Sequence, residues 1–241
     1  RDTLSLPYND SDAFERLMRQ KGERVAGVIV EPVAGNMGLV APVKGFLQTL
    51  RRLTAQHGAL LIFDEVLSGF RMCRGGAQEY YGVTPDLCTL AKALGGGVPI
   101  SAVCGRGEVM GVLNPSGHTV VSGTYTGHLI SVLAAIACQE EIAKPGFYAH
   151  IDALAERLYG GLRELFQMMG VPAVVQGIGA RFGIYFGLDG PVTNYRQVTQ
   201  GDRALAEDMA QEAFLRVLRS IRQYRYPRPF KPWLYQIAVN L

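Results

Sequence analysis

Two ionisable residues follow short apolar segments that are typical of β-strands. Residues 59–63 are all apolar and lead into Asp64 and Glu65, and residues 86–91 lead into Lys92. An apolar run that ends in acidic residues indicates a strand buried on both faces of a parallel sheet. Ligands of open α/β sheets bind at the ends of such strands. We therefore expect Asp64 and Lys92 to converge on one ligand site.

An acid and a lysine at neighbouring strand ends suit the chemistry of pyridoxal 5'-phosphate. The lysine can form a Schiff base with the aldehyde, and the carboxylate can keep the pyridinium nitrogen protonated, which makes the ring an electron sink. Glycines 95–97 would let the backbone turn tightly beside the lysine. A buried Asp–Lys ion pair, or a lysine on a solvated loop, accounts for the same spacing, and spacing alone favours these structural alternatives.

Longer motifs surround both residues. In chain order they read EPVAGNMG (31–38), FDEVLSGFR (63–71), GVTPDL (82–87), AKALGGGVP (91–99) and SGTYTGH (122–128). Together they resemble the class III (fold type I) aminotransferases over about residues 1–203. Within that family, EPVAGNMG and GGAQEYYGVTPDL (75–87) are most similar to the glutamate-1-semialdehyde 2,1-aminomutases.

The resemblance implies an α/β fold. Residues 1–145 would form a truncated large domain with a mostly parallel sheet, the domain that binds pyridoxal phosphate. Residues 146–203 would supply a linking helix and the start of the small α+β domain. Residues 204–241 would follow as a helical tail. Much of the family's small domain, and the glycine-rich phosphate loop that precedes these motifs, are expected to be absent from this chain.

The resemblance also assigns roles at the ring of the cofactor. Asp64 would hold the pyridinium nitrogen, and Val66 would pack on the face of the ring. Lys92 would bind the aldehyde and then act as general base and acid on the substrate's α-proton. By the same matching, Glu31 and Asn36 would lie in the cofactor pocket, with Asn36 near the ring oxygen.

Thr124 would reach the phosphate of the cofactor in the partner subunit, which implies a homodimer. A threonine hydroxyl beside a glycine can donate to a phosphate that the backbone approaches closely. Many family members have Asn-Pro after the following glycine, whereas this chain has His128-Leu129. That difference leaves the substrate subfamily open, and so a transaminase and an aminomutase both fit.

Hydrophobic periodicity and turn signals predict the remaining elements. We take the apolar side of the helix at 128–143 as ordinary core, with Leu129, Val132, Leu133 and Ile136 on it. The expected helices are 11–21, 44–57, 105–113, 128–143, 147–169 and 205–223; the expected strands are 25–30, 59–63, 86–91, 100–104 and a pair within 171–188.

The tail resembles a second family. AEDMAQEAFLRV (206–217) and RPFKPWLYQIAVN (228–240) are similar to region 2 of extracytoplasmic-function sigma factors. That resemblance implies a helical hairpin, with Trp233 near the apolar stripe of the first helix, that contacts RNA polymerase or DNA. A solvated basic helix face accounts for the same residues. Two families joined without a linker predict a chimeric chain.

Composition adds few constraints. The net charge of +3 over 241 residues is too small to indicate a particular partner. No two of the four cysteines form a CxxC pair, which predicts reduced thiols in a cytoplasmic protein and no metal site. No signal peptide and no apolar run of about 18 residues is evident, so we expect no membrane span.

The sequence therefore predicts a pyridoxal-phosphate-dependent aminotransferase or aminomutase that acts on an amino acid or an amine. The alternatives are an ω-amine transaminase and a transcription module with a relic enzyme in front. Because truncation at both ends would leave faces of the sheet and the helix at 147–169 without partners, we also expect a large exposed apolar surface there and association of the chain.

Overall fold

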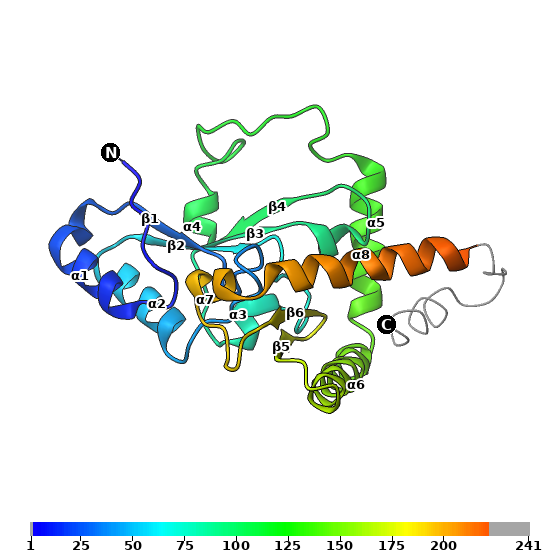
Figure 1. Cartoon of the computed structure of the whole chain (residues 1–241). Helices are drawn as coiled ribbons and strands as arrows, with labels where there is room; N and C mark the ends of the chain where they lie inside the picture. The colour runs from blue at the N-terminus through cyan, green and yellow to red at the C-terminus, as the bar shows by residue number, and fades with distance from the viewer. Residues whose placement is uncertain (1, 222–241) are drawn as a thin grey trace.

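The computed structural model describes residues 2–221, and a four-stranded sheet lies at its centre (Figure 1). The strands are β1 (Gly27–Val30), β2 (Leu60–Glu65), β3 (Leu87–Leu90) and β4 (Ala102–Gly105), in that spatial order. β1, β2 and β3 pair in parallel, and β4 joins β3 in the antiparallel sense. The expected α/β class with a mostly parallel sheet is confirmed.

Helices α1 (Ser11–Lys21) and α2 (Phe46–Gln56) supply the main core against one face of this sheet. Asp10 caps α1, because its Oδ1 accepts a hydrogen bond of 2.8 Å from the amide of Ala13. Both helices match their predicted ranges within two residues at each end. Their apolar stripes meet the inward side chains of β2 in one cluster: Phe14, Met18, Phe46, Leu47, Leu50, Leu53, Leu61 and Phe63.

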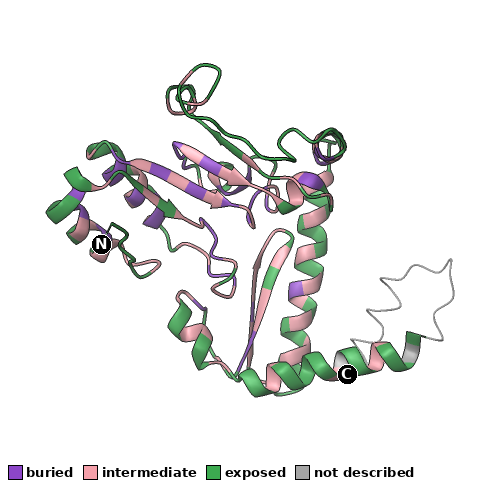
Figure 2. Cartoon of the chain, turned by 90° about the horizontal axis from the view of Figure 1, so that it is seen from above, coloured by how far each residue is buried: buried purple, intermediate pink, exposed green. Residues whose placement is uncertain are grey.

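The expectation that β2 is buried on both faces is wrong. Leu61, Phe63 and Glu65 are buried, whereas the alternate residues Leu60, Ile62 and Asp64 are only half-buried. Figure 2 shows buried and half-buried positions alternating along the central sheet. On the half-buried face, Ile29 of β1 is 66% exposed and Val103 of β4 is 57% exposed. The register places both side chains with Ile62 and Asp64, so this face is open at its two edges.

Short elements connect the sheet strands. A five-residue helix, α3 (Gly76–Tyr80), lies between β2 and β3, and the short 3-10 helices are η1 (Gly22–Arg24) and η2 (Lys92–Gly95). α4 (Gly107–Met110) follows β4 and is shorter than the predicted helix at 105–113. Residues 111–128 then form a largely exposed connection.

Helix α5 (Leu129–Ile142) contradicts the expectation of an ordinary core helix. Leu129 is 67% exposed, Leu133 55% and Ile136 49%, while Val132 is half-buried. One side of α5 packs against η2 and the next helix. Apolar residues of α5 also lie on its other sides. We expected exposed apolar surface on the sheet and on the helix at 147–169, and the exposed residues of α5 are not part of that prediction.

Helix α6 (Phe147–Met168) leads to an antiparallel hairpin of β5 (Ala173–Ile178) and β6 (Arg181–Phe186), as predicted. The side-chain amide of Gln176 bonds to the carbonyls of Leu39 and Val192, which ties the hairpin to the loop after β1. The boundary expected at residue 145 falls between α5 and α6, and the division into domains stays a prediction.

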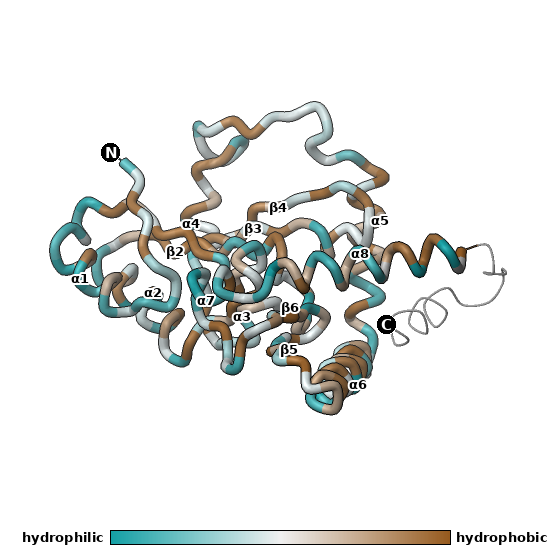
Figure 3. The backbone as a smooth tube through the Cα atoms, viewed as in Figure 1, coloured by the Kyte–Doolittle hydropathy of each residue, from teal (hydrophilic) through white to brown (hydrophobic). Residues whose placement is uncertain are grey.

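Two further helices follow the hairpin. α7 (Tyr195–Gln200) was not expected and is held by a capping box between Asn194 and Gln197. α8 (Arg203–Ser220) extends away from the rest of the chain, and Phe214 and Leu218 on it are 71% and 66% exposed (Figures 1 and 3). The predicted partner helix and Trp233 lie outside the described residues. None of the helices described is long and apolar enough to cross a membrane.

Candidate cofactor site

Asp64 is held in place by its neighbours on the sheet. Its partner across the parallel ladder is Thr89, whose Oγ1 donates a hydrogen bond of 3.1 Å to Asp64 Oδ1. The amide of Val66 donates to the same oxygen, also at 3.1 Å. Within residues 2–221, Oδ2 carries no hydrogen bond, so the carboxylate is oriented while one oxygen stays available to a ligand.

Lys92 lies three residues after Thr89, at the first position of η2. Its φ of 47° lies in the left-handed region, which costs a non-glycine residue about 1 kcal/mol. α5 supports this turn, because Cys138 Sγ donates to the carbonyl of Ala93 at 3.2 Å. The Lys92 side chain is exposed.

Lys92 lines a cavity of about 500 Å³. A cavity of this volume is large enough to be a small-ligand site. The other lining residues come from the loop after β2, from η2 and the glycines after it, from α5, from the start of α6 and from the β5–β6 turn. They are Phe70, Arg71, Ala93, Gly96, Gly97, Cys138, Ile142, Phe147, Tyr148, Ile151 and Ala180. The lining is mostly apolar, and its cationic groups are Lys92 and Arg71.

The structure brings Asp64 and Lys92 to the ends of adjacent parallel strands, as the sequence predicts. The cavity that Lys92 lines does not include Asp64, Val66 or Asn36. Convergence of these side chains on one cavity therefore stays a prediction.

The other predicted site residues lie on two loops. Glu31 is half-buried and its Oε2 accepts from the amide of Gly35 at 2.9 Å, which closes the turn after β1. Asn36 lies in the same loop with its side chain exposed. Thr124 lies in the exposed connection before α5 and does not line the Lys92 cavity.

Glu65 has a structural role that sequence reasoning missed. It is fully buried and accepts hydrogen bonds from the amide of Ala77 at 2.6 Å, the hydroxyl of Ser68 at 3.2 Å and the amide of Gln78 at 3.3 Å. Burial raises the pKa of Glu65, and these donors oppose the rise. A Cβ at Gly76 would collide with the carboxylate. The pair Gly75-Gly76 was the sequence signal for this close approach.

Asp86, which directly precedes β3, is a second buried acid. Its carboxylate accepts from the amide of Leu61 at 2.8 Å and from Arg51 and Arg106 at 2.9 Å each. Burial acts to raise the pKa of Asp86, but the Leu61 amide and the two arginines lower it overall. Asp86 therefore joins β2, α2 and the residue after β4 at the end of β3 opposite to Lys92.

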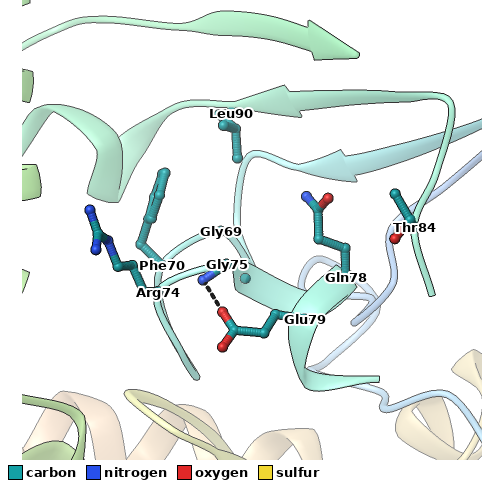
Figure 4. Close-up of a pocket in the computed structure, with 9 residues that line it drawn as sticks. Gly69, Phe70, Arg74, Gly75, Gln78, Glu79, Thr84 and Leu90 are labelled. Carbon is teal, nitrogen blue, oxygen red and sulfur yellow. Dashed lines mark hydrogen bonds between the residues drawn. The ribbon is translucent and has the colours of Figure 1, made fainter. Parts of the chain in front are cut away.

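A second cavity, of about 400 Å³, lies beside α3 (Figure 4). Phe70 and Arg74 lie on one side of it, and Gln78 and Thr84 lie on the opposite side. Glu79 Oε2 accepts from the amide of Gly75 at 2.5 Å, so this acid is committed to the loop. Among the described residues, no cluster of His, Cys, Asp or Glu could hold a metal ion.

A carboxylate and a lysine at adjacent strand ends of such a sheet are the arrangement of fold type I enzymes. The family model "Aminotransferase class-III" matches residues 2–212, and the chain belongs to this family. A second model, "Sigma-70 region 2", matches residues 192–241 and overlaps the end of the first.

The curated relatives include glutamate-1-semialdehyde 2,1-aminomutases. That of Thermomicrobium roseum is 45% identical over 99% of this chain and 54% of its own length. That of Desulforapulum autotrophicum is 46% identical over 83% of this chain and 46% of its own. The chain thus spans about half the length of the curated relatives it matches.

Solved structures show the same fold. An ω-transaminase from Sphaerobacter thermophilus superposes with a TM-score of 0.79 at 33% identity, covering 88% of this chain and 48% of that one. A glutamate-1-semialdehyde aminomutase from Pseudomonas aeruginosa, in complex with PMP, gives 0.71 at 29% identity, covering 83% and 46%. Another similar structure is described as a transaminase with PLP bound.

Proposed function

We propose that this chain carries the acid and the lysine of a pyridoxal-phosphate site and serves an aminotransferase or aminomutase reaction. The observation that carries the proposal is the placement of Asp64 and Lys92 at the ends of adjacent parallel strands, with Asp64 oriented by Thr89. An oriented carboxylate with one available oxygen fits a protonated ring nitrogen. An exposed lysine on a cavity fits an aldehyde.

In this proposal each side chain has a defined task. Asp64 Oδ2 keeps the proton on the ring nitrogen, and Val66 packs on the ring. Lys92 Nζ would hold the aldehyde of the cofactor, and as a free amine it would accept and return the proton at the substrate's α-carbon. When bound, the cofactor supplies an electron sink for the charge left on that carbon.

The remaining assignments extend the same proposal. Glu31 and Asn36 would border the cofactor, and Thr124 would serve the cofactor of the second subunit of a homodimer. The substrate is an amino acid or an amine. Relatives named as aminomutases and as an ω-transaminase support both reaction types. The four free cysteines of the described chain fit the reducing cytoplasm.

The test is a titration of the protein with pyridoxal phosphate, followed by visible absorbance. Wild-type protein should develop a band distinct from that of the free cofactor. Lys92→Ala should abolish the band, whereas Lys44→Ala, which alters an exposed lysine on another loop, should keep it. Equal bands in all three proteins would contradict the assignment of Lys92 as the lysine that binds the cofactor.

The match to a sigma-70 region 2 model favours a second candidate function for the tail. We propose that α8, with its exposed Phe214 and Leu218, contacts RNA polymerase or DNA. After Glu212 all charged residues are basic, and so DNA binding should weaken with salt. A pull-down of core polymerase should lose signal with Asp208→Arg but not with Asp152→Arg on α6. Equal signals would leave the tail without this function.

A further inference from the structure

Arg71 follows the site strand β2 and has a backbone that is fixed from two sides. Its carbonyl accepts from the amide of Ala180 in the β5–β6 turn at 3.0 Å. The carbonyl of the preceding Phe70 accepts from the hydroxyl of Tyr148 at 3.2 Å, and Phe70 itself has a φ of 61°. The turn approaches so closely at Gly179 that a Cβ there would collide with Arg71. The base of the Arg71 side chain is therefore held rigidly.

The guanidinium of Arg71, a half-buried residue, has a buried nitrogen without a hydrogen-bond partner within the described chain. Its Nε is buried and has no hydrogen-bond acceptor in the described part of the chain. Its guanidinium forms no salt bridge with any carboxylate of residues 2–221. Burial, together with the positive charge of Arg181, lowers the pKa of Arg71. A buried donor without an acceptor points to an acceptor brought by a ligand.

Arg181, the first residue of β6, adds a second cation at the same place. It shares a narrow recess with Arg71, together with Leu67, Ser68 and Ile178. It too makes no salt bridge within the described residues. The two positive charges repel each other, and an anion that contacts both would reduce that repulsion. The recess itself has a volume of only about 10 Å³, so such an anion would lie at its opening.

Arg71 lines both this recess and the Lys92 cavity, whereas Arg181 lines the recess alone. Apart from Lys92 and Arg71, the larger cavity is bordered mainly by apolar side chains such as Phe70, Ile142 and Phe147. A ligand that suits this lining has an aliphatic body and one anionic end. A guanidinium pair recognises a carboxylate well because its donors match the two oxygens.

We propose that Arg71 and Arg181 form a carboxylate-binding subsite of the Lys92 cavity, which would take the carboxylate of an aliphatic amino or keto acid. Its role as a substrate subsite rests on the proposed function of Lys92. Binding of a carboxylate at the two arginines does not depend on that function.

The test uses pentanoate and its neutral analogue pentanamide, measured by isothermal titration calorimetry on the full chain without cofactor. Pentanoate should bind, and Arg71→Gln or Arg181→Gln should weaken it by about ten-fold or more. Arg71→Lys should recover part of the affinity, and Arg74→Gln, which alters the exposed neighbouring arginine, should have no effect. Equal binding of pentanamide, unchanged affinity in the glutamine variants or absent binding in wild type would overturn the subsite.

Two further measurements complete the test. The first asks whether Arg71 binds a ligand or only stabilises the fold, and the second separates the subsite from the proposed function of Lys92. Without ligand, Arg71→Gln should melt no lower than wild type, because it removes a half-buried cation that has no acidic partner among the described residues; a clear drop in Tm would assign Arg71 a structural role instead. Lys92→Ala should keep pentanoate binding. If pentanoate binds but no pyridoxal phosphate attaches to Lys92, the proposed function fails while the subsite stands.

Discussion

Asp64 and Glu65 are adjacent carboxylates on one strand, yet they lie on opposite faces of the sheet and differ in burial and in bonding. Glu65 is fully buried on the face that α1 and α2 cover, and its oxygens are used by Ser68, Ala77 and Gln78. Asp64 is half-buried on the other face, with one oxygen oriented by Thr89. One face of the sheet thus supplies stability, while the other offers a carboxylate for chemistry.

The covered face should show the strongest response to mutation. Phe63 is completely buried in the main core, and so Phe63→Ala should lower the free energy of unfolding by about 3–5 kcal/mol. Urea unfolding followed by circular dichroism measures the change. A loss below about 1 kcal/mol would show that the covered face is not what stabilises the chain.

Glu65 should leave a pH signature on stability. Burial raises its pKa above the unfolded value of 4.5, so the folded chain binds this proton at a higher pH than the unfolded chain does. Its contribution to the free energy of unfolding therefore falls as the pH rises above 4.5 toward the folded pKa. Wild type should gain stability relative to Glu65→Gln when urea unfolding is repeated at pH 5 instead of pH 7. The opposite sign would mean that the donors outweigh burial.

Asp64 should behave differently from its neighbour. Asp64→Asn keeps an oxygen for Thr89 and Val66 but cannot hold a proton on a ring nitrogen. We expect a change below about 1 kcal/mol in unfolding and a weakening of pyridoxal phosphate binding by about ten-fold, measured by absorbance titration. A variant that binds the cofactor as well as wild type would show that this face does no chemistry through Asp64.

The open edge of the sheet should respond least. Ile29 is 66% exposed on the same face as Asp64, so Ile29→Ala should change the free energy of unfolding by less than about 0.5 kcal/mol. Urea unfolding beside Phe63→Ala gives the contrast directly. A loss above about 2 kcal/mol would show that this face is covered in solution, as it would be by a second copy of the chain.

The sequence predicted the strands that end at Asp64 and near Lys92 because apolar runs and family motifs both mark them. It could not predict that only one face of β2 is buried, because the same apolar residues suit both outcomes and the covering elements decide. The same reason applies to α5, whose apolar residues remain exposed where no partner packs on them.

The supporting residues of the site were harder to find. Glu65 acts through amides 12 and 13 positions away, in a segment without hydrophobic periodicity. α7 did have a signal, since Asn194 and Gln197 stand at capping-box spacing. The pairing of Arg71 with Arg181 joins residues 110 positions apart in the sequence, and so only the fold reveals it.

Identifying the lysine that binds the cofactor would decide whether Lys92 has the role proposed for it. The chain has five lysines: Lys21, Lys44, Lys92, Lys144 and Lys231. Protein mixed with pyridoxal phosphate would be reduced with borohydride, digested and mapped by mass spectrometry. We expect the pyridoxyl label on Lys92 in clear excess over the other four. Equal labelling of all five would contradict the assignment of Lys92, and with it the cofactor site.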